Sequence, residues 1–171
     1  MQNNLETYFR DSWKPDYDKF NHTGWELLKK IDKNAHILDI GCGYNLFKPH
    51  FKNLYGIDPY NDEADEVISL EDFVPHKNFD VYLALGSLNF GTKKTIDNQV
   101  KRLYNITKKG DRIIWRQNPG LRDHPWQGVE AVKFFPWNLK YNLYFTDKYN
   151  FELTTFMKDT GDRYYVEWIR N

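Results

Sequence analysis

The chain has 171 residues, of which 40% are hydrophobic and 28% charged, and this composition fits a globular protein that buries a sizeable core. Its 24 Lys and Arg residues balance its 24 Asp and Glu residues, which counts against nucleic acid as the main partner, because binding phosphates requires a surplus of cations on one face. No apolar run reaches the roughly 20 residues of a membrane span, and the single cysteine fits a reducing compartment, so we expect a cytoplasmic protein without membrane contact.

The pattern of apolar residues predicts one domain over residues 1–171, in which residues 1–33 form an N-terminal helical lid or cap. Behind this segment, seven short runs are rich in aliphatic, β-branched or aromatic residues and are bounded by glycine, proline or polar residues. We expect strands over residues 36–40, 54–58, 66–69, 79–85, 111–117, 151–157 and 163–169. The last two runs enclose a turn that contains glycine, and they therefore predict an antiparallel hairpin.

Helices are expected between these runs. Ile96, Val100 and Leu103 are spaced as one apolar helix face, and this helix should end near Gly110, which follows two lysines. Shorter helices are expected over residues 47–52 and within 137–148. Strands that alternate with helices predict an α/β fold with three layers, a sandwich in which helices cover both faces of a mostly parallel seven-stranded sheet.

A glycine turn follows the first expected strand. Gly41 and Gly43 flank Cys42 there, and such a turn lets the backbone approach a ligand closely. Asp39 lies two residues before the turn, and Asp58 ends the second expected strand 19 residues after Asp39. A carboxylate in that second position can accept hydrogen bonds from the hydroxyls of a ribose.

In the run Asp39-Ile40-Gly41-Cys42-Gly43, the chain resembles class I S-adenosylmethionine-dependent methyltransferases, whose fold is Rossmann-like. The resemblance implies S-adenosylmethionine as the cofactor. It implies that Asp58, with Pro59 beside it, holds the ribose hydroxyls. The turn residues that would contact the methionine part of the cofactor are Asp39, Gly41, Cys42 and Gly43.

The same resemblance assigns the remaining contacts with the cofactor. Asp72, in the loop after the third expected strand, would accept a hydrogen bond from the adenine amino group, with Glu71 as its rival and Phe73 as a ring neighbour. The residues after the fourth expected strand that would flank the methionine part are Leu85, Gly86 and Ser87. The chain departs from the family at Asn45, where a third glycine is frequent. It also lacks the D-P-P-Y or N-P-P-Y motif that DNA amino-methylating enzymes carry after the fourth strand.

Candidates for catalysis lie after the fifth expected strand. Residues 118–137 should lie over the carboxyl ends of the sheet, where ligands bind in α/β folds. Asp123 and His124 are the candidates for a base that accepts a proton from the methyl acceptor, and Arg116 and Asn118 would position that acceptor. The alternative is structural, with the aromatic residues of this segment packed on the sheet and its charges facing solvent.

We expect no metal ion. The five histidines are scattered, and none has a partner at the spacing of metal ligands. The ends of the fourth and fifth expected strands carry Asn89 and Asn118 instead of the carboxylates that would hold magnesium.

The expected function is methyl transfer from S-adenosylmethionine to an acceptor that is a small molecule or a protein rather than nucleic acid. One alternative is a protein that cleaves or senses the cofactor without methyl transfer. Another is a dinucleotide-dependent oxidoreductase, which Leu46 disfavours because the dinucleotide fingerprint has a small residue at that position.

Overall fold

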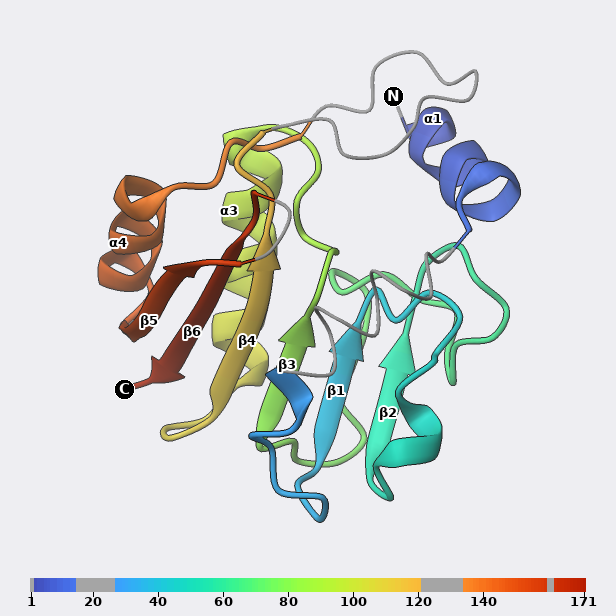
Figure 1. The fold of residues 1–171 in the computed structure, drawn as a ribbon, viewed down its shortest axis with the longest axis horizontal. Coiled ribbons are helices and arrows are strands. Elements are labelled where there is room, and N and C mark those ends of the chain that lie inside the picture. Colours follow the sequence, from blue (N-terminus) through green and yellow to red (C-terminus); the bar gives the residue numbers. More distant parts are fainter. Residues whose placement is uncertain (1, 15–26, 121–133, 160–161) are drawn as a thin grey trace.

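The fold is known from a computed structural model, which describes residues 2–14, 27–120, 134–159 and 162–171 (Figure 1). The chain begins with α1 (Gln2–Thr7) and a short π-helix, η1 (Tyr8–Ser12). The later helices are a 3-10 turn η2 (Lys48–His50), α3 (Lys93–Ile106) and α4 (Leu139–Lys148). The strands are β1 (Ile37–Ile40), β2 (Leu54–Ile57), β3 (Val81–Ala84), β4 (Arg112–Gln117), β5 (Phe151–Lys158) and β6 (Tyr164–Arg170).

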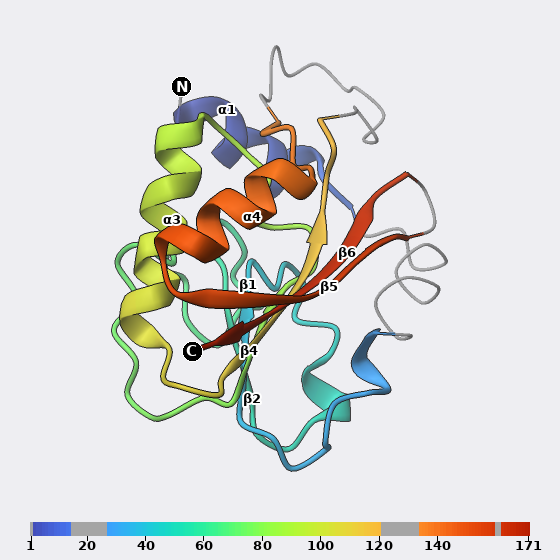
Figure 2. The same cartoon turned by 90° about the vertical axis from the view of Figure 1, so that its left-hand side faces the viewer.

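The strands form one sheet in the order β2-β1-β3-β4-β6-β5. The first four strands of the chain are parallel, and β6 pairs antiparallel with both β4 and β5. A register shift between Leu153 and Thr155 interrupts the ladder of the hairpin. Helices α3 and α4 cover one face of the sheet, and residues 27–31 and η2 lie on the other (Figure 2). The mostly parallel sheet and its terminal hairpin confirm the predicted α/β architecture.

The prediction of seven strands was wrong, because the described residues form six. Of the run 66–69, only Glu66 makes an isolated parallel bridge with Ile57. Ile68 packs against the core while Val67 is 50% exposed, and the bridge joins Glu66 to the last residue of β2, so no ladder continues along this run. The helix expected over residues 47–52 is also shorter than predicted, because the backbone is already extended at Phe51, three residues before β2 begins.

The core lies on both sides of the sheet, and its larger half is aromatic. On α3, the predicted face of Ile96, Val100 and Leu103 is fully buried. Beside it, the rings of Trp115 and Trp168 lie with their centroids 4.9 Å apart, with more aromatic rings from α4 around them. No helix in the described ranges is long and apolar enough to cross a lipid bilayer.

A buried amide joins α4 to the sheet. The side chain of Asn142 exchanges two hydrogen bonds with the side chain of Gln117 on β4, at 2.8 and 3.0 Å. Its Oδ1 also accepts a hydrogen bond from Trp168 Nε1 on β6. Since neither Asn142 nor Gln117 has exposed surface, their polar groups depend on these protein partners and not on water.

Replacing Asn142 with Ala should therefore lower the free energy of unfolding by about 2 kcal/mol or more, because buried donors and acceptors on Gln117 and Trp168 lose their partner. Urea unfolding measures this change. Asn98→Ala, an exposed position on α3, is the matched control and should change stability by less than about 0.5 kcal/mol. Equal effects of the two variants would contradict the role given to Asn142.

Candidate functional site

The predicted glycine turn lies at the carboxyl end of β1, where the backbone takes a path that favours glycine. The φ angles of Gly41 and Gly43 are +69° and +54°. Gly41 and Cys42 donate backbone hydrogen bonds to the carbonyl of Ile57, at 2.8 and 3.1 Å, and so hold the turn against the end of β2. The turn therefore lies between the carboxyl ends of two neighbouring parallel strands, where α/β folds bind ligands.

Because Gly41 has no side chain, the loop after β3 can approach the glycine turn closely. A Cβ at this position would lie closer to Cβ of Ser87 than real atoms approach. The hydroxyl of Ser87 in turn donates a hydrogen bond to the carbonyl of Ile40. The predicted residues Leu85, Gly86 and Ser87 are all partly exposed at this place. The structure thus brings the loop after β3 against the glycine turn.

Asp58 orients the turn from the neighbouring strand. Its Oδ2 accepts a hydrogen bond from the backbone N–H of Gly43 at 3.0 Å, and its Oδ1 accepts one from Tyr60 at 2.8 Å. The residue is only 8% exposed, and this burial raises the pKa of its carboxyl, while the backbone donors oppose the shift. Pro59, which follows, is partly exposed.

Asp39 is a second buried carboxyl group beside the turn. It is 3% exposed, and burial, together with the charge of Asp58, raises its pKa to about 7. The structure therefore gathers Asp39, Cys42, Gly43 and Asp58 into one buried group at the ends of β1 and β2. A carboxyl group with such a pKa is half protonated near neutral pH, and a cation placed beside it would favour its charged form.

The predicted adenine contacts lie further along the loop that follows β2. Asp72 is exposed, and its Oδ2 accepts a hydrogen bond from Ser69 Oγ at 2.8 Å, which closes a local turn. Glu71 accepts one from Gln99 of α3 at 3.0 Å. Phe73 has no exposed surface, and its ring lies 6.2 Å from that of Tyr55 within the core. Core packing is the role that this placement gives the Phe73 side chain.

Asn89 has a role that the sequence did not reveal, because it was considered only as a missing metal ligand. Its Nδ2 donates to the carbonyls of Gly86 and Arg116, and its Oδ1 accepts from the backbone N–H of Asn118 at 3.0 Å. Asn89 therefore ties the loop after β3 to the end of β4. Only the tertiary structure brings these segments together, so no local sequence pattern could have identified it.

The N-terminal segment contacts the loops that follow β1, β2 and β3. The ring of Phe9 stacks on Tyr60 with centroids 6.0 Å apart and meets the edge of Phe90 at 5.3 Å. The ring of Trp13 stacks on Tyr44 at 5.7 Å. In Figure 1, α1 and η1 accordingly lie beyond the arrowheads of β1 and β2. Phe9 and Trp13 both belong to the segment 1–33 that the sequence analysis predicted as a lid or cap.

The catalytic candidates Asp123 and His124 lie outside the described residues. Arg116 and Asn118, predicted to position an acceptor, are buried at the end of β4, and Nε of Arg116 forms an ion pair with Asp159 at 2.7 Å. Within the described ranges, no group of three His, Cys, Asp or Glu side chains is arranged to hold a metal ion.

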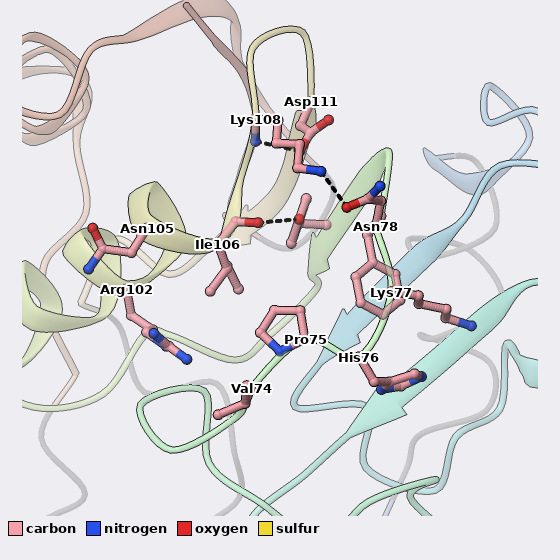
Figure 3. Close-up of a pocket in the computed structure, with 12 residues that line it drawn as sticks. Val74, Pro75, His76, Lys77, Asn78, Arg102, Asn105, Ile106, Lys108 and Asp111 are labelled. Carbon is pink, nitrogen blue, oxygen red and sulfur yellow. Dashed lines mark hydrogen bonds between the residues drawn. The ribbon is translucent and has the colours of Figure 1, made fainter.

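A separate pocket of about 410 Å³ opens at the opposite end of the sheet (Figure 3). It lies between residues 74–79 and the end of α3, beside the amino ends of β3 and β4. Tyr82 Oη donates to the carbonyl of Ile106 in its wall, and Lys108 Nζ donates to Asn78. None of the residues predicted to bind the cofactor lines this pocket.

The close approach at Gly41 predicts a large effect of adding one methyl group. Gly41→Ala should lower the free energy of unfolding by about 3 kcal/mol or more, since it combines an unfavourable φ with overlap against Ser87. Gly110→Ala is the matched control, because Gly110 also has a positive φ, +91°, but nothing within 4 Å of an added Cβ. The control substitution should lower the free energy of unfolding by only about 1–2 kcal/mol. Equal losses in urea unfolding would show that Ser87 does not approach as described.

The raised pKa of Asp39 predicts a pH dependence of stability. The group titrates near 7 in the folded chain and near 3.9 in an unfolded one, so the folded state retains a proton that the unfolded state releases between these values. Stability should therefore fall as pH rises from about 4 to about 7, by about 4 kcal/mol from this residue alone, and its contribution should level off above that.

Asp39→Asn, which cannot titrate, should remove this contribution. Unfolding in urea at intervals between pH 4.5 and pH 8 should show a shallower decline for the variant than for the unmodified chain. Identical slopes would mean that the carboxyl of Asp39 keeps an ordinary pKa.

Comparison with known proteins gives similarity of structure and none of sequence. No protein-family model and no curated protein sequence matches the chain. The PH0226 protein of Pyrococcus horikoshii OT3 has a TM-score of 0.70 at 15% identity, with 96% of each chain covered. Magnesium protoporphyrin IX methyltransferase (ChlM) of Synechocystis PCC 6803 with bound SAH has a TM-score of 0.69 at 10% identity, with 100% of both chains covered. The DhpI–SAH complex has a TM-score of 0.72 at 10% identity, and the match covers 99% of this chain and 96% of the DhpI chain. The chain therefore has the Rossmann-like fold of class I S-adenosylmethionine-dependent methyltransferases.

Proposed function

We propose that this protein is an S-adenosylmethionine-dependent methyltransferase. The observation that carries the proposal is the glycine turn between β1 and β2, with the buried carboxyl groups of Asp39 and Asp58 on its two sides. Ligands of open α/β sheets bind at this edge, outside the carboxyl ends of the strands. The likeness of the fold to methyltransferases, including two solved with SAH, supports the same reading.

Asp58 would hold the ribose hydroxyls of the cofactor. Its Oδ2 accepts a backbone hydrogen bond from Gly43 and its Oδ1 one from Tyr60, and the backbone of Asn61 is a further donor to this carboxyl. A carboxylate offers about four acceptor positions, so about one remains for a ribose hydroxyl. The remaining proposed contacts are Asp72 at the adenine amino group, Pro59 beside the ribose, and Asp39, Gly41, Cys42, Leu85, Gly86 and Ser87 around the methionine part.

S-Adenosylmethionine bound there would supply an activated methyl group for in-line displacement by an acceptor, with the electron pair of the broken C–S bond remaining on sulfur. The protein would contribute position and exclusion of water. Asp123 or His124 would accept a proton from an acceptor that arrives protonated, and Arg116 and Asn118 would orient it.

The N-terminal segment, residues 1–33, is proposed as a lid within a single domain. The contacts of Phe9 and Trp13 with the loops after β1, β2 and β3 support this, because those loops carry the proposed cofactor contacts. A small molecule or a protein is the proposed acceptor, since the balanced charge does not favour nucleic acid, and the cytoplasm is the proposed location.

Calorimetric titration with S-adenosylmethionine and S-adenosylhomocysteine tests the proposal. We expect micromolar binding of both, and we expect Asp58→Ala to weaken it about tenfold or more, because hydrogen bonds to a charged group are worth about 1.5–3 kcal/mol each. Asp62→Ala, an exposed carboxylate in the same loop, is the matched control and should leave both affinities unchanged.

Asp58→Asn tests whether Asp58 acts by contacting the ligand or by folding the turn. The amide of this variant retains one oxygen that can accept a hydrogen bond from a backbone N–H, so the turn can still form. Folded protein that binds neither ligand would refute the proposed function. Binding with conversion of the cofactor to fragments, instead of S-adenosylhomocysteine and a methylated acceptor, would show cleavage rather than methyl transfer.

A further inference from the structure

The pocket at the amino ends of β3 and β4 has the size of a site for a small molecule. Its volume is about 410 Å³, and ligand pockets occupy about 300–1,000 Å³. Two hydrogen bonds cross between its walls: Tyr82 Oη donates to the carbonyl of Ile106 at 2.9 Å, and Lys108 Nζ donates to Asn78. These bonds hold β3 and the loop before it to the end of α3, so the pocket has fixed walls.

Cations outnumber carboxylates in the lining of this pocket. Among the described residues that line it, the cations are Lys77, Arg102 and Lys108. The carboxylate is that of Asp111, whose Oδ2 accepts a hydrogen bond from the backbone N–H of Lys108 at 2.7 Å. Asp80, an acid close to Asp111, is engaged by the backbone N–H of His36 at 2.9 Å. None of the three cations forms an ion pair with a described residue, so the lining has an excess of positive charge.

Arg102 has donor groups that the described residues leave without an acceptor. Its Nη2 donates to the carbonyl of Phe73, whereas its Nε is shielded from solvent and meets no acceptor within the described ranges. Leaving such a donor unsatisfied is costly. A guanidinium held at one corner also presents a flat edge of paired donors to an oxyanion. An anionic group beside Arg102 would therefore compensate a charge that the described residues do not.

The carbonyl groups at the end of α3 do not account for these cations. Thr107 Oγ1 donates to the carbonyls of Leu103 and Tyr104, at 2.8 and 3.3 Å. The carbonyl of Ile106 accepts from Tyr82. Because neutral donors satisfy these acceptors, the positive charge of the pocket is left for a ligand.

Apolar side chains lie beside the cations. Val74 is 75% exposed, and Pro75 and Ile106 are partly exposed. Figure 3 shows Pro75 and Ile106 between the guanidinium of Arg102 and the ammonium of Lys108. An apolar group placed here would remove this surface from water, which is favourable. The lining thus combines a cationic part with an apolar part.

We propose that this pocket binds a small organic anion, in which an apolar body carries a phosphate or a carboxylate. The anionic group would lie at Arg102 with Lys108 attracting it, and the body would cover the apolar side chains of the lining. The pocket and the glycine turn lie at opposite ends of the sheet, and none of the proposed cofactor contacts lines the pocket. The inference therefore stands apart from the proposed function.

NMR titration of the isotope-labelled chain tests the proposal with four probes: phenyl phosphate, benzoate, inorganic phosphate and benzamide. Phenyl phosphate or benzoate should shift the backbone amide signals of residues 76–79 and 105–111 saturably, with a Kd of about 1 mM or tighter. Inorganic phosphate lacks the apolar body and benzamide lacks the charge, so each should bind about tenfold more weakly than the better anion. Comparison of phenyl phosphate with benzoate identifies the preferred anionic group.

Substitutions in the lining should change the affinity for the better anion in opposite directions. Arg102→Met should weaken it about tenfold or more, and Lys108→Met about threefold. Asp111→Asn keeps an oxygen for the backbone N–H of Lys108 but removes a negative charge, so it should strengthen binding. Lys101→Met is the matched control, because Lys101 is an exposed cation of α3 outside the pocket, and it should leave the affinity unchanged.

Thermal unfolding checks that the variants fold. Should Arg102→Met fail to fold without its contact to Phe73, the opposite effects expected of Lys108→Met and Asp111→Asn decide in its place.

The inference is overturned if benzamide binds as tightly as the anions, if inorganic phosphate binds as tightly as phenyl phosphate, or if the shifts lie outside the pocket. It is equally overturned if Lys101→Met weakens binding as much as the lining variants do. Failure of the proposed function is a separate result, seen as a lack of S-adenosylhomocysteine binding.

Discussion

The hydrogen bond from the backbone N–H of Gly43 to the carboxylate of Asp58 is the contact on which the candidate site depends. It joins the turn after β1 to the residue that ends β2, and the second oxygen of the same carboxylate orients Tyr60 in the next loop. Because Asp58 is buried, its charge relies on these fixed donors in place of water. One side chain thereby shapes two loops, and the close approach of Ser87 to Gly41 adds the third.

The polarity of the buried residues changes along the strands of the sheet. Towards the amino ends and the middle its residues are apolar, as in Ile113 and Trp115 of β4, whereas buried polar residues gather where the parallel strands end. That group consists of Asp39, Asp58, Asn89, Arg116, Gln117 and Asn118. Such residues are costly to bury without partners, and several of them find partners across the fold: Asn89 accepts from the backbone N–H of Asn118, Gln117 exchanges hydrogen bonds with Asn142 of α4, and Arg116 pairs with Asp159. Apolar packing along the strands and polar contacts at their ends, such as that between Gln117 and Asn142, therefore both hold the sheet together.

Local patterns were sufficient to predict much of this structure. The periodicity of Ile96, Val100 and Leu103 identified α3, and the glycine turn and Asp58 were identified from residue type and spacing alone. Predictions failed where tertiary context decides. The run 66–69 has β-forming residues but meets only the last residue of β2, and the surroundings of Phe73 and Asn89 are created by segments distant in the sequence. The ring contacts of Phe9 have the same origin, because nothing in its neighbourhood distinguishes it from the other aromatic residues.

The register shift in the terminal hairpin has a consequence for association between copies of the chain. Strand β5 is the outermost strand on its side, and an outer strand with regular hydrogen-bonding groups is a template on which another chain can extend the sheet. The irregularity between Leu153 and Thr155 breaks the regular spacing of those groups and increases the local twist. Glu152 and Lys158 add charges along the same strand. The irregular hairpin of β5 and β6 therefore also works against aggregation through edge-to-edge strand pairing.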